Sequence, residues 1–224
     1  MGVSAVENLL REGLERLGPV DLPVEAVAQL GQYTAELLRW NARVNLTAIT
    51  ELREVVDKHL LDSLAVLPEL DVCRAQTVLD LGAGAGLPGI VWAIARPALQ
   101  VTLVDAVAKK VSFMKAVVAR LGLTARVRPV HLHLAGDPEG EGLPGAEVVV
   151  SRAFMELESW LMLARAYVAP GGHIAAMTGQ PVTDAEFGRV SQRTGCRLVS
   201  ARHFALPLSG DGRGVSLWAP APVS

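Results

Sequence analysis

The chain has 224 residues, 50% of them hydrophobic and 20% charged, which suits one sizeable α/β domain. A formal net charge of -2 excludes a protein held on nucleic acid by bulk charge, because non-specific binding needs many Lys and Arg contacts to phosphate. The two cysteines form no C-x-x-C pair, and no stretch of 18 residues is apolar and free of charge, so neither a zinc or disulfide framework nor a membrane span is expected.

Helical periodicity dominates the first third of the chain. The three predicted helices cover residues 4–17, 23–43 and 51–67. Ser4 is expected to cap the first helix, and Pro68 to close the third. We therefore expect an N-terminal helical segment over residues 1–73, followed by a core over 74–224, the two forming a single structural unit.

After residue 74, short apolar or β-branched runs alternate with helical stretches. The runs predicted as strands are 77–82, 101–106, 126–132, 146–152 and 173–178, and the helical stretches between several of them are 88–96, 107–121 and 156–168. This alternation is typical of a doubly wound, mostly parallel sheet with helices on both faces. Two last runs, 197–206 and 214–220, flank a turn-rich segment and predict a closing antiparallel hairpin.

A glycine-rich loop follows the first predicted strand and opens a helix. Its sequence is DLGAGAG, with glycines at Gly82, Gly84 and Gly86, at the edge of the sheet where doubly wound folds bind cofactors. Asp105 ends the second predicted strand, 23 residues after Gly82, where a carboxylate can accept both ribose hydroxyls. Asp80 lies before the glycines, where a carboxylate suits the cationic amino-acid end of S-adenosylmethionine.

A nicotinamide cofactor is the main competitor for this loop. Its phosphate-binding fingerprint, G-x-G-x-x-G, is broken because Leu87 stands three residues after Gly84. A carboxylate at Asp80 would also repel a pyrophosphate, whereas S-adenosylmethionine has no phosphate. The pattern favours the methyl donor, with a nicotinamide-dependent oxidoreductase as the alternative.

Several longer segments carry a more specific likeness. They are WNARVNLTAIT (40–50), HLLDSL (59–64), VLDLGAGAGLPGI (78–90), VTLVDAVAKKVSFM (101–114) and SRAF (151–154). In this order and spacing the chain resembles the 16S ribosomal RNA (guanine-N7) methyltransferase family, also called glucose-inhibited division protein B. The resemblance implies a class I S-adenosylmethionine-dependent methyltransferase, Rossmann-like in fold, acting on 16S ribosomal RNA or the small ribosomal subunit.

The resemblance also implies cofactor contacts. They fall at Gly82, Leu87, Leu134 with Ala135 after the third strand, and Arg152, which would face both cofactor and acceptor. The chain departs from the family twice. Ala135 stands where the family has an acid, whose role Asp137 could take, and Thr178 stands where the family has a lysine.

Four side chains are candidates for contacts with the methyl acceptor. His59 and Asp62 lie one helical turn apart, although a hydrogen-bonded network joining helix to loop is the alternative for this pair. Lys109 and Lys110 could contact RNA phosphates or simply be solvated.

Guanine nitrogen-7 already carries an in-plane lone pair, so no catalytic base is expected and catalysis would consist of alignment. We expect no metal, no membrane, a monomer and a cytoplasmic location. A second alternative is a non-catalytic RNA-binding or assembly factor that kept the fold, motivated by Ala135 and Thr178.

Overall fold

The computed structural model describes residues 3–152, 155–180 and 182–221. The N-terminal helices are α1 (Val3–Leu17), α2 (Ala26–Val44), α3 (Leu52–Val55), η1 (Val56–Leu61), α4 (Asp62–Leu64) and α5 (Leu67–Val72). Ser4 lies inside α1 and does not cap it. Pro68 begins α5 instead of ending a helix, because a first-turn proline lacks only an N–H that has no partner in the helix. The third predicted helix is interrupted by η1, a π-helix.

The predicted sheet is confirmed. Its strands are β1 (Thr77–Leu81), β2 (Gln100–Asp105), β3 (Val127–His131), β4 (Ala146–Arg152), β5 (Val168–Thr178), β6 (Cys196–Ala205) and β7 (Gly212–Pro220). The described residues form one seven-stranded sheet in the order β3-β2-β1-β4-β5-β7-β6. Strands β1 to β5 are parallel, and β7 lies antiparallel between β5 and β6, as the expected closing hairpin requires.

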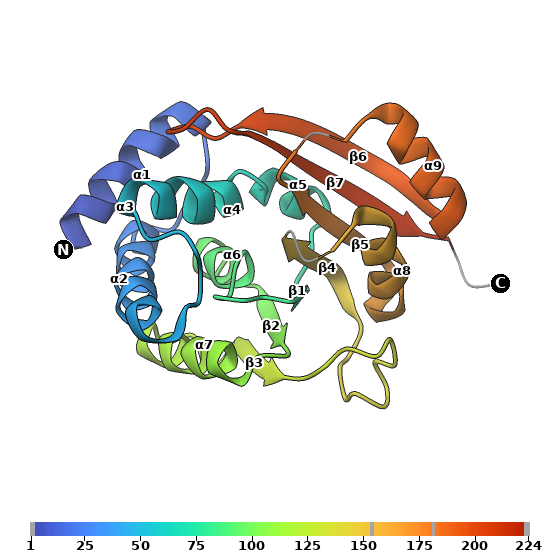
Figure 1. The fold of residues 1–224 in the computed structure, drawn as a ribbon, viewed down its shortest axis with the longest axis horizontal. Helices are drawn as coiled ribbons and strands as arrows, with labels where there is room; N and C mark the ends of the chain where they lie inside the picture. The colour runs from blue at the N-terminus through green and yellow to red at the C-terminus, as the bar shows by residue number, and fades with distance from the viewer. Residues whose placement is uncertain (1–2, 153–154, 181, 222–224) are drawn as a thin grey trace.

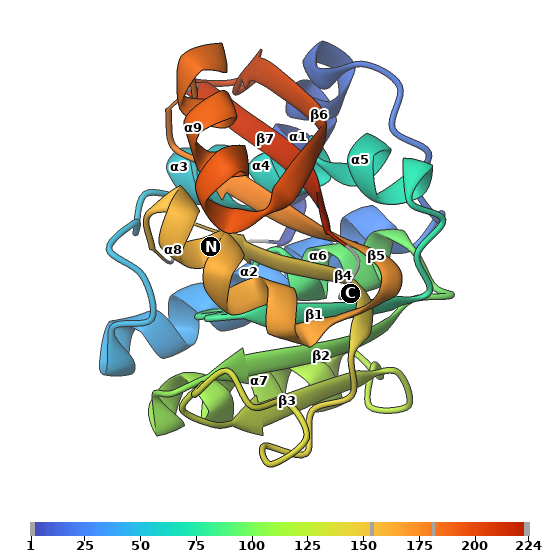
Figure 2. The ribbon, with the colours of Figure 1, turned by 90° about the vertical axis from the view of Figure 1, so that its right-hand side faces the viewer.

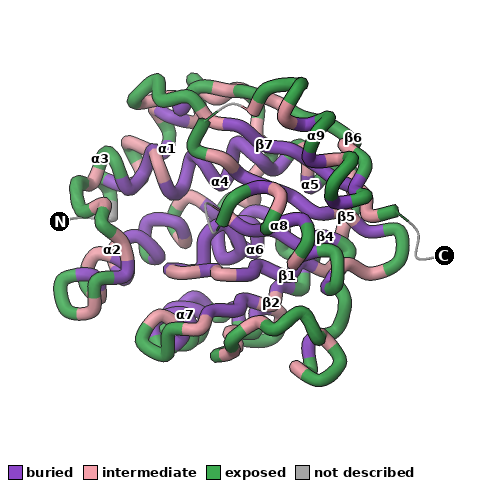
Figure 3. Tube along the Cα trace, turned by 45° about the vertical axis from the view of Figure 1, so that its right-hand side comes forward, coloured by how far each residue is buried: buried purple, intermediate pink, exposed green. Residues whose placement is uncertain are grey.

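Helices cover both faces of the sheet (Figures 1 and 2). They are α6 (Gly89–Ala95), α7 (Ala108–Arg120), α8 (Leu157–Ala164), η2 (Arg165–Tyr167) and α9 (Asp184–Thr194). One apolar core joins α1, α2, α6 and α7 to the sheet, with Trp92 and Phe113 fully buried. The other lies under α8 and α9, around Trp160 and Trp218. Figure 3 shows the buried chain running through the strands between these two layers.

The N-terminal helices are also joined to the closing hairpin. The buried carboxylate of Asp57 accepts hydrogen bonds from the backbone N–H groups of Leu208 (3.0 Å) and Ser209 (2.9 Å) in the turn between β6 and β7. Arg202 of β6 forms a two-pronged ion pair with Glu69 of α5, at 2.7 and 3.0 Å. The helical segment therefore packs against both the sheet and its last two strands.

Candidate functional site

The glycine loop is fixed in a conformation that its sequence makes possible. Gly82, Gly84 and Gly86 all have positive φ (73°, 61° and 81°), which side chains rarely tolerate. The N–H groups of Gly82 and Ala83 both donate to the Val104 carbonyl, each at 2.9 Å. These bonds hold the loop against the end of β2, so β1, β2 and the loop meet at the carboxyl edge of the sheet, where the sequence predicts the cofactor.

Asp105 stabilises the conformation of the same loop through hydrogen bonds. Its Oδ2 accepts a hydrogen bond from the Gly84 N–H (2.9 Å), and its Oδ1 accepts one from the Val107 N–H (2.8 Å). The ammonium of Lys110 lies 3.7 Å from Oδ2. Each carboxylate oxygen keeps a second lone pair, so Asp105 can hold the loop and still accept hydrogen bonds from a ligand diol.

A pocket of about 350 Å³ opens beside Asp105. Its other lining residues include Gly82, Val104, Leu132, Leu134, Met155 and Leu163. This size falls within the range of small-molecule sites, and one carboxylate among mainly apolar walls suits a nucleoside.

The segment after β3, part of which lines this pocket, is held in place by hydrogen bonds to the side chains of Glu141 and Tyr167. The Ala135 N–H donates to the Glu141 carboxylate, and the Gly136 N–H donates to the Tyr167 hydroxyl at 2.9 Å. The same hydroxyl donates to the second oxygen of Glu141 at 2.7 Å. Asp137, in contrast, accepts from the Gly140 N–H within its own loop, so Glu141 supplies the carboxylate next to Ala135.

Asp80 is fully buried beneath the loop. Its Oδ2 accepts a hydrogen bond from the Gly89 N–H (2.9 Å), and its Oδ1 has no hydrogen-bond partner in the part of the chain that the structure describes. Burial raises the pKa of Asp80 to about 7, although the Gly89 N–H and the charge of Arg152 oppose the rise. A buried carboxylate with an unpaired oxygen fits a cationic ligand group, because an opposite charge would favour its ionised form.

A second pocket, of about 320 Å³, lies at the end of β4 and β5. It is lined by three cations, one acid, one histidine and four other residues: Lys58, Arg152, Arg213, Asp62, His59, Ile49, Met177, Thr178 and Gly179. Asp62 Oδ2 lies 3.6 Å from Arg152 and its Oδ1 lies 3.7 Å from Arg213. Burial nevertheless raises the pKa of Asp62, because it outweighs the opposing charges of Arg152 and Arg213.

His59 stands between the pocket and the α2–α3 loop. Arg152 Nη1 donates to the Lys58 carbonyl (2.7 Å) and contacts His59 Nδ1 at 3.1 Å. Nδ1 also lies 3.1 Å from the Lys58 carbonyl oxygen, and Nε2 lies 3.0 Å from Thr47 Oγ1, so both ring nitrogens are in hydrogen-bonded contacts. Burial, reinforced by Arg152, lowers the pKa of His59 to about 4, which keeps the ring neutral at pH 7.

The structure therefore divides the predicted site residues between two places. Gly82, Asp105 and Leu134 line the first pocket, while His59, Asp62 and Arg152 line the second. Lys110 faces Asp105, and Lys109 is exposed. The other predicted contacts shape the loop or its surroundings: Asp80, Gly84, Gly86, Leu87 and Ala135.

Sequence reasoning missed Glu141, Tyr167 and Arg213. Glu141 lies in the polar insertion 136–145 and Arg213 is the second residue of β7, and neither has a local pattern that points to a site. Among the described residues, no three His, Cys, Asp or Glu side chains are placed to hold a metal ion, and no helix is long and apolar enough to cross a membrane.

Comparison with known proteins gives a consistent result. The family model described as rRNA small subunit methyltransferase G matches residues 26–202. A protein of Myxococcus xanthus named ribosomal RNA small subunit methyltransferase G is 53% identical over 95% of this chain and 96% of its own length. A protein of the same name from Anaeromyxobacter sp. is 49% identical over 96% of this chain and 97% of its own length.

The fold also has solved counterparts. The crystal structure of a SAM-dependent methyltransferase from Aquifex aeolicus superimposes with a TM-score of 0.54 over 74% of this chain and 92% of that chain, at 20% identity. At this identity the likeness concerns the fold, and it confirms the expected class I, Rossmann-like architecture.

Proposed function

Because the chain belongs to the rRNA small subunit methyltransferase G family, we propose that it transfers a methyl group from S-adenosylmethionine to nitrogen-7 of a guanine in 16S ribosomal RNA. The observation that carries the proposal is the pairing of a nucleoside-sized pocket at Asp105 with a cation-lined pocket around Arg152, both at the carboxyl edge of the sheet.

The first pocket suits the methyl donor. We assign the ribose to Asp105, the adenine to the apolar wall at Leu134, and the amino-acid end to the loop 82–87 above Asp80. When bound, S-adenosylmethionine supplies a methyl group made electrophilic by a positively charged sulfur. Glu141 and Tyr167 hold the wall that contacts the adenine, which offsets the missing acid at Ala135.

The second pocket suits a guanine nucleotide. Arg152 and Arg213 offer charge for a phosphate or for the acceptor edge of guanine, and they offset the missing lysine at Thr178, whereas Lys58 is paired with Glu54 and Asp211. His59 is a poor proton acceptor here, because burial and the charge of Arg152 lower its pKa to about 4. A neutral, weakly basic His59 suits guanine nitrogen-7 as the acceptor, because that nitrogen needs no base.

Transfer of a labelled methyl group tests the proposal. Ribosomal RNA and small subunits from a strain lacking the modification should be labelled, and mapping the labelled base should give a guanine modified at nitrogen-7. An Asp105→Asn variant should lose cofactor binding and transfer together. Binding of ribosomal RNA without any transfer would favour the non-catalytic assembly factor, and saturable binding of NAD without response to S-adenosylhomocysteine would favour the oxidoreductase.

We also propose that the protein acts in the cytoplasm, because its bacterial substrate is there, and that it acts as a monomer. The large apolar side chains that are exposed in the described structure come from different segments, and of them Val107 and Met155 line the first pocket: Val24, Val72, Val107, Met155, Met162 and Val199. Sedimentation velocity at micromolar concentration should give a single species of monomer mass.

A further inference from the structure

The segment from Ala106 to Gly136 has an unusual charge. Six of the 21 Lys and Arg residues lie in it, and none of the 23 Asp and Glu does. The segment forms α7 and β3, and β3 is the last strand at one edge of the sheet. A protein with net charge -2 thus concentrates positive charge on one outer edge.

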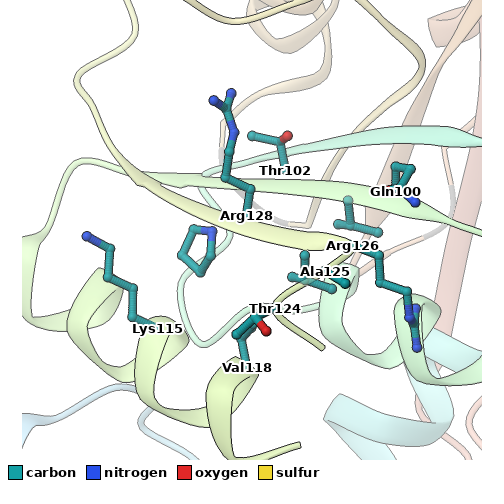
Figure 4. Close-up of a pocket in the computed structure, with 11 residues that line it drawn as sticks. Gln100, Thr102, Lys115, Val118, Thr124, Ala125, Arg126 and Arg128 are labelled. Carbon is teal, nitrogen blue, oxygen red and sulfur yellow. The ribbon is translucent and has the colours of Figure 1, made fainter. Parts of the chain in front are cut away.

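A groove of about 560 Å³ runs along this edge, and we call it the α7–β3 groove. Its polar and charged lining residues are Gln100, Thr102, Lys115, Thr124, Arg126 and Arg128. Figure 4 shows the side chains of Arg128 and Lys115 extending from β3 and α7. The guanidinium of Arg126 is directed toward α6, where it donates to the Ala93 carbonyl.

Two cations of this edge, Lys110 and Arg120, have acidic partners, whereas Lys115 and Arg128 in the groove have none among the described residues. Lys110 lies by Asp105 at 3.7 Å, and Arg120 pairs with Glu36 at 3.0 Å. Lys115 and Arg128 are exposed and form neither an ion pair nor a hydrogen bond with any described residue. These two side chains are therefore available to a ligand.

We propose that the α7–β3 groove binds the phosphate backbone of the ribosomal RNA substrate, on a part of the RNA away from the base that is methylated. The inference rests on the proposed function and adds a second RNA-binding surface to it. Phosphate contacts position an RNA without reading its sequence, and Lys, Arg and nearby hydroxyl or amide groups are the side chains that make them. Gln100, Thr102 and Thr124 supply those neutral groups.

The position of the groove fits this role. Helix α7 begins next to Asp105, at the cofactor edge, and runs away from it, so Lys115 lies one to two helical turns from the first pocket, roughly 10 Å along the helix axis. The groove is lined by the first residues of β2 and the start of β3, so it would hold a stretch of RNA away from the methyl donor. Pro129 lies on the same edge strand and has no backbone N–H, which disfavours pairing with an added protein strand.

The test compares two variants that change net charge equally. The double variant Lys115→Gln/Arg128→Gln removes two charges from the groove, while Arg189→Glu changes the charge of an exposed, unpaired residue on α9 by the same amount. Binding of 16S ribosomal RNA is measured from 50 to 200 mM salt. The double variant should bind about tenfold more weakly for each phosphate interaction that it removes and show a salt slope reduced by roughly 1.4 to 1.8, and Arg189→Glu should match the wild type.

Two further measurements separate this inference from the proposed function. Affinity for S-adenosylhomocysteine should be unchanged in the double variant, and in methyl transfer its KM for RNA should rise while kcat stays within about twofold. The proposal would be refuted if the double variant kept the wild-type salt slope, or if Arg189→Glu lost as much affinity for RNA as the double variant. Competition by poly-glutamate as strong as by RNA would point to an acidic protein instead and would also overturn it. If the wild-type protein binds RNA through the groove but transfers no methyl group to it, the groove is supported and the proposed function is refuted.

Discussion

Replacing Asp80 by Asn should stabilise the protein without cofactor at pH 8 while weakening its affinity for the cofactor. Asp80 is fully buried, and burial raises its pKa from 3.8 to about 7. Because the folded-state pKa is raised, the contribution of Asp80 to stability is fully present below pH 3.8 and is lost as the pH rises through about 7.

The magnitude follows from the shift. One pKa unit corresponds to about 1.4 kcal/mol, so relative to pH below 3.8 the raised pKa lowers stability by roughly 4 kcal/mol at pH 8, where folded Asp80 is ionised, and by about 2 kcal/mol at pH 5, where it is protonated and the unfolded carboxyl is not. Asn has nearly the same size, keeps an oxygen that can accept from the Gly89 N–H, and does not ionise. The free energy of unfolding of Asp80→Asn, relative to the wild type, should therefore rise by roughly 2 to 3 kcal/mol from pH 5 to pH 8.

Urea unfolding of both proteins at the two pH values measures this difference, in which the titration of other groups cancels. Calorimetric titration with S-adenosylhomocysteine measures the expected loss of cofactor affinity. Wild-type affinity should rise as the pH passes through about 7, since the ligand ammonium favours an ionised Asp80, while the variant should bind weakly at every pH. A relative stability independent of pH would refute the buried-carboxylate argument. Wild-type affinity in the variant at pH 8 would limit Asp80 to a structural role.

Three further outcomes are expected. His59→Gln should remove a pH dependence: with a pKa lowered to about 4, the stabilising contribution of His59 is complete above pH 6.5 and falls by roughly 3 kcal/mol toward pH 4, as urea unfolding of the two proteins across that range would reveal. Arg152→Ala should slow methyl transfer by about 1.5–3 kcal/mol and leave S-adenosylhomocysteine affinity nearly unchanged, because Arg152 lines the second pocket and not the first; an equal loss of S-adenosylhomocysteine affinity would instead assign Arg152 a contact with the donor. Glu141→Ala should weaken S-adenosylhomocysteine binding by about 1–2 kcal/mol in calorimetry because it frees the backbone at Ala135, whereas Glu139→Ala in the same loop should not; equal effects would contradict the role given to Glu141.

Periodicity predicted the layers of this fold well and its boundaries unevenly. The strand predicted over 146–152 has those bounds as β4, because a continuous apolar run between turns has no competing structure. Helix α9 was not predicted, although Thr183 and Glu186 form a T-x-x-E capping signature before it and Gly195 ends it. Strand β5 begins five residues earlier than its apolar run, since Pro170, Gly171 and Gly172 hide its start.

The two pockets also differed in how far the sequence alone predicted them. Glycines followed by an acid at the end of the next strand are a local pattern, and they indicated the first pocket directly. The second pocket brings together segments around residues 49, 59, 152, 178 and 213, which no spacing along the chain connects. Glu141 was missed because it acts through a loop that folds back on the segment before it.

The bond between Asp57 and the β6–β7 turn has a consequence for synthesis. Asp57 lies in a helix made early, but its partners Leu208 and Ser209 follow 151 and 152 residues later. The helical segment can collapse as it leaves the ribosome, yet a buried carboxylate without donors is unstable. We infer that residues 1–73 reach their native packing only after the last two strands have emerged, so the chain matures as one cooperative unit, and late.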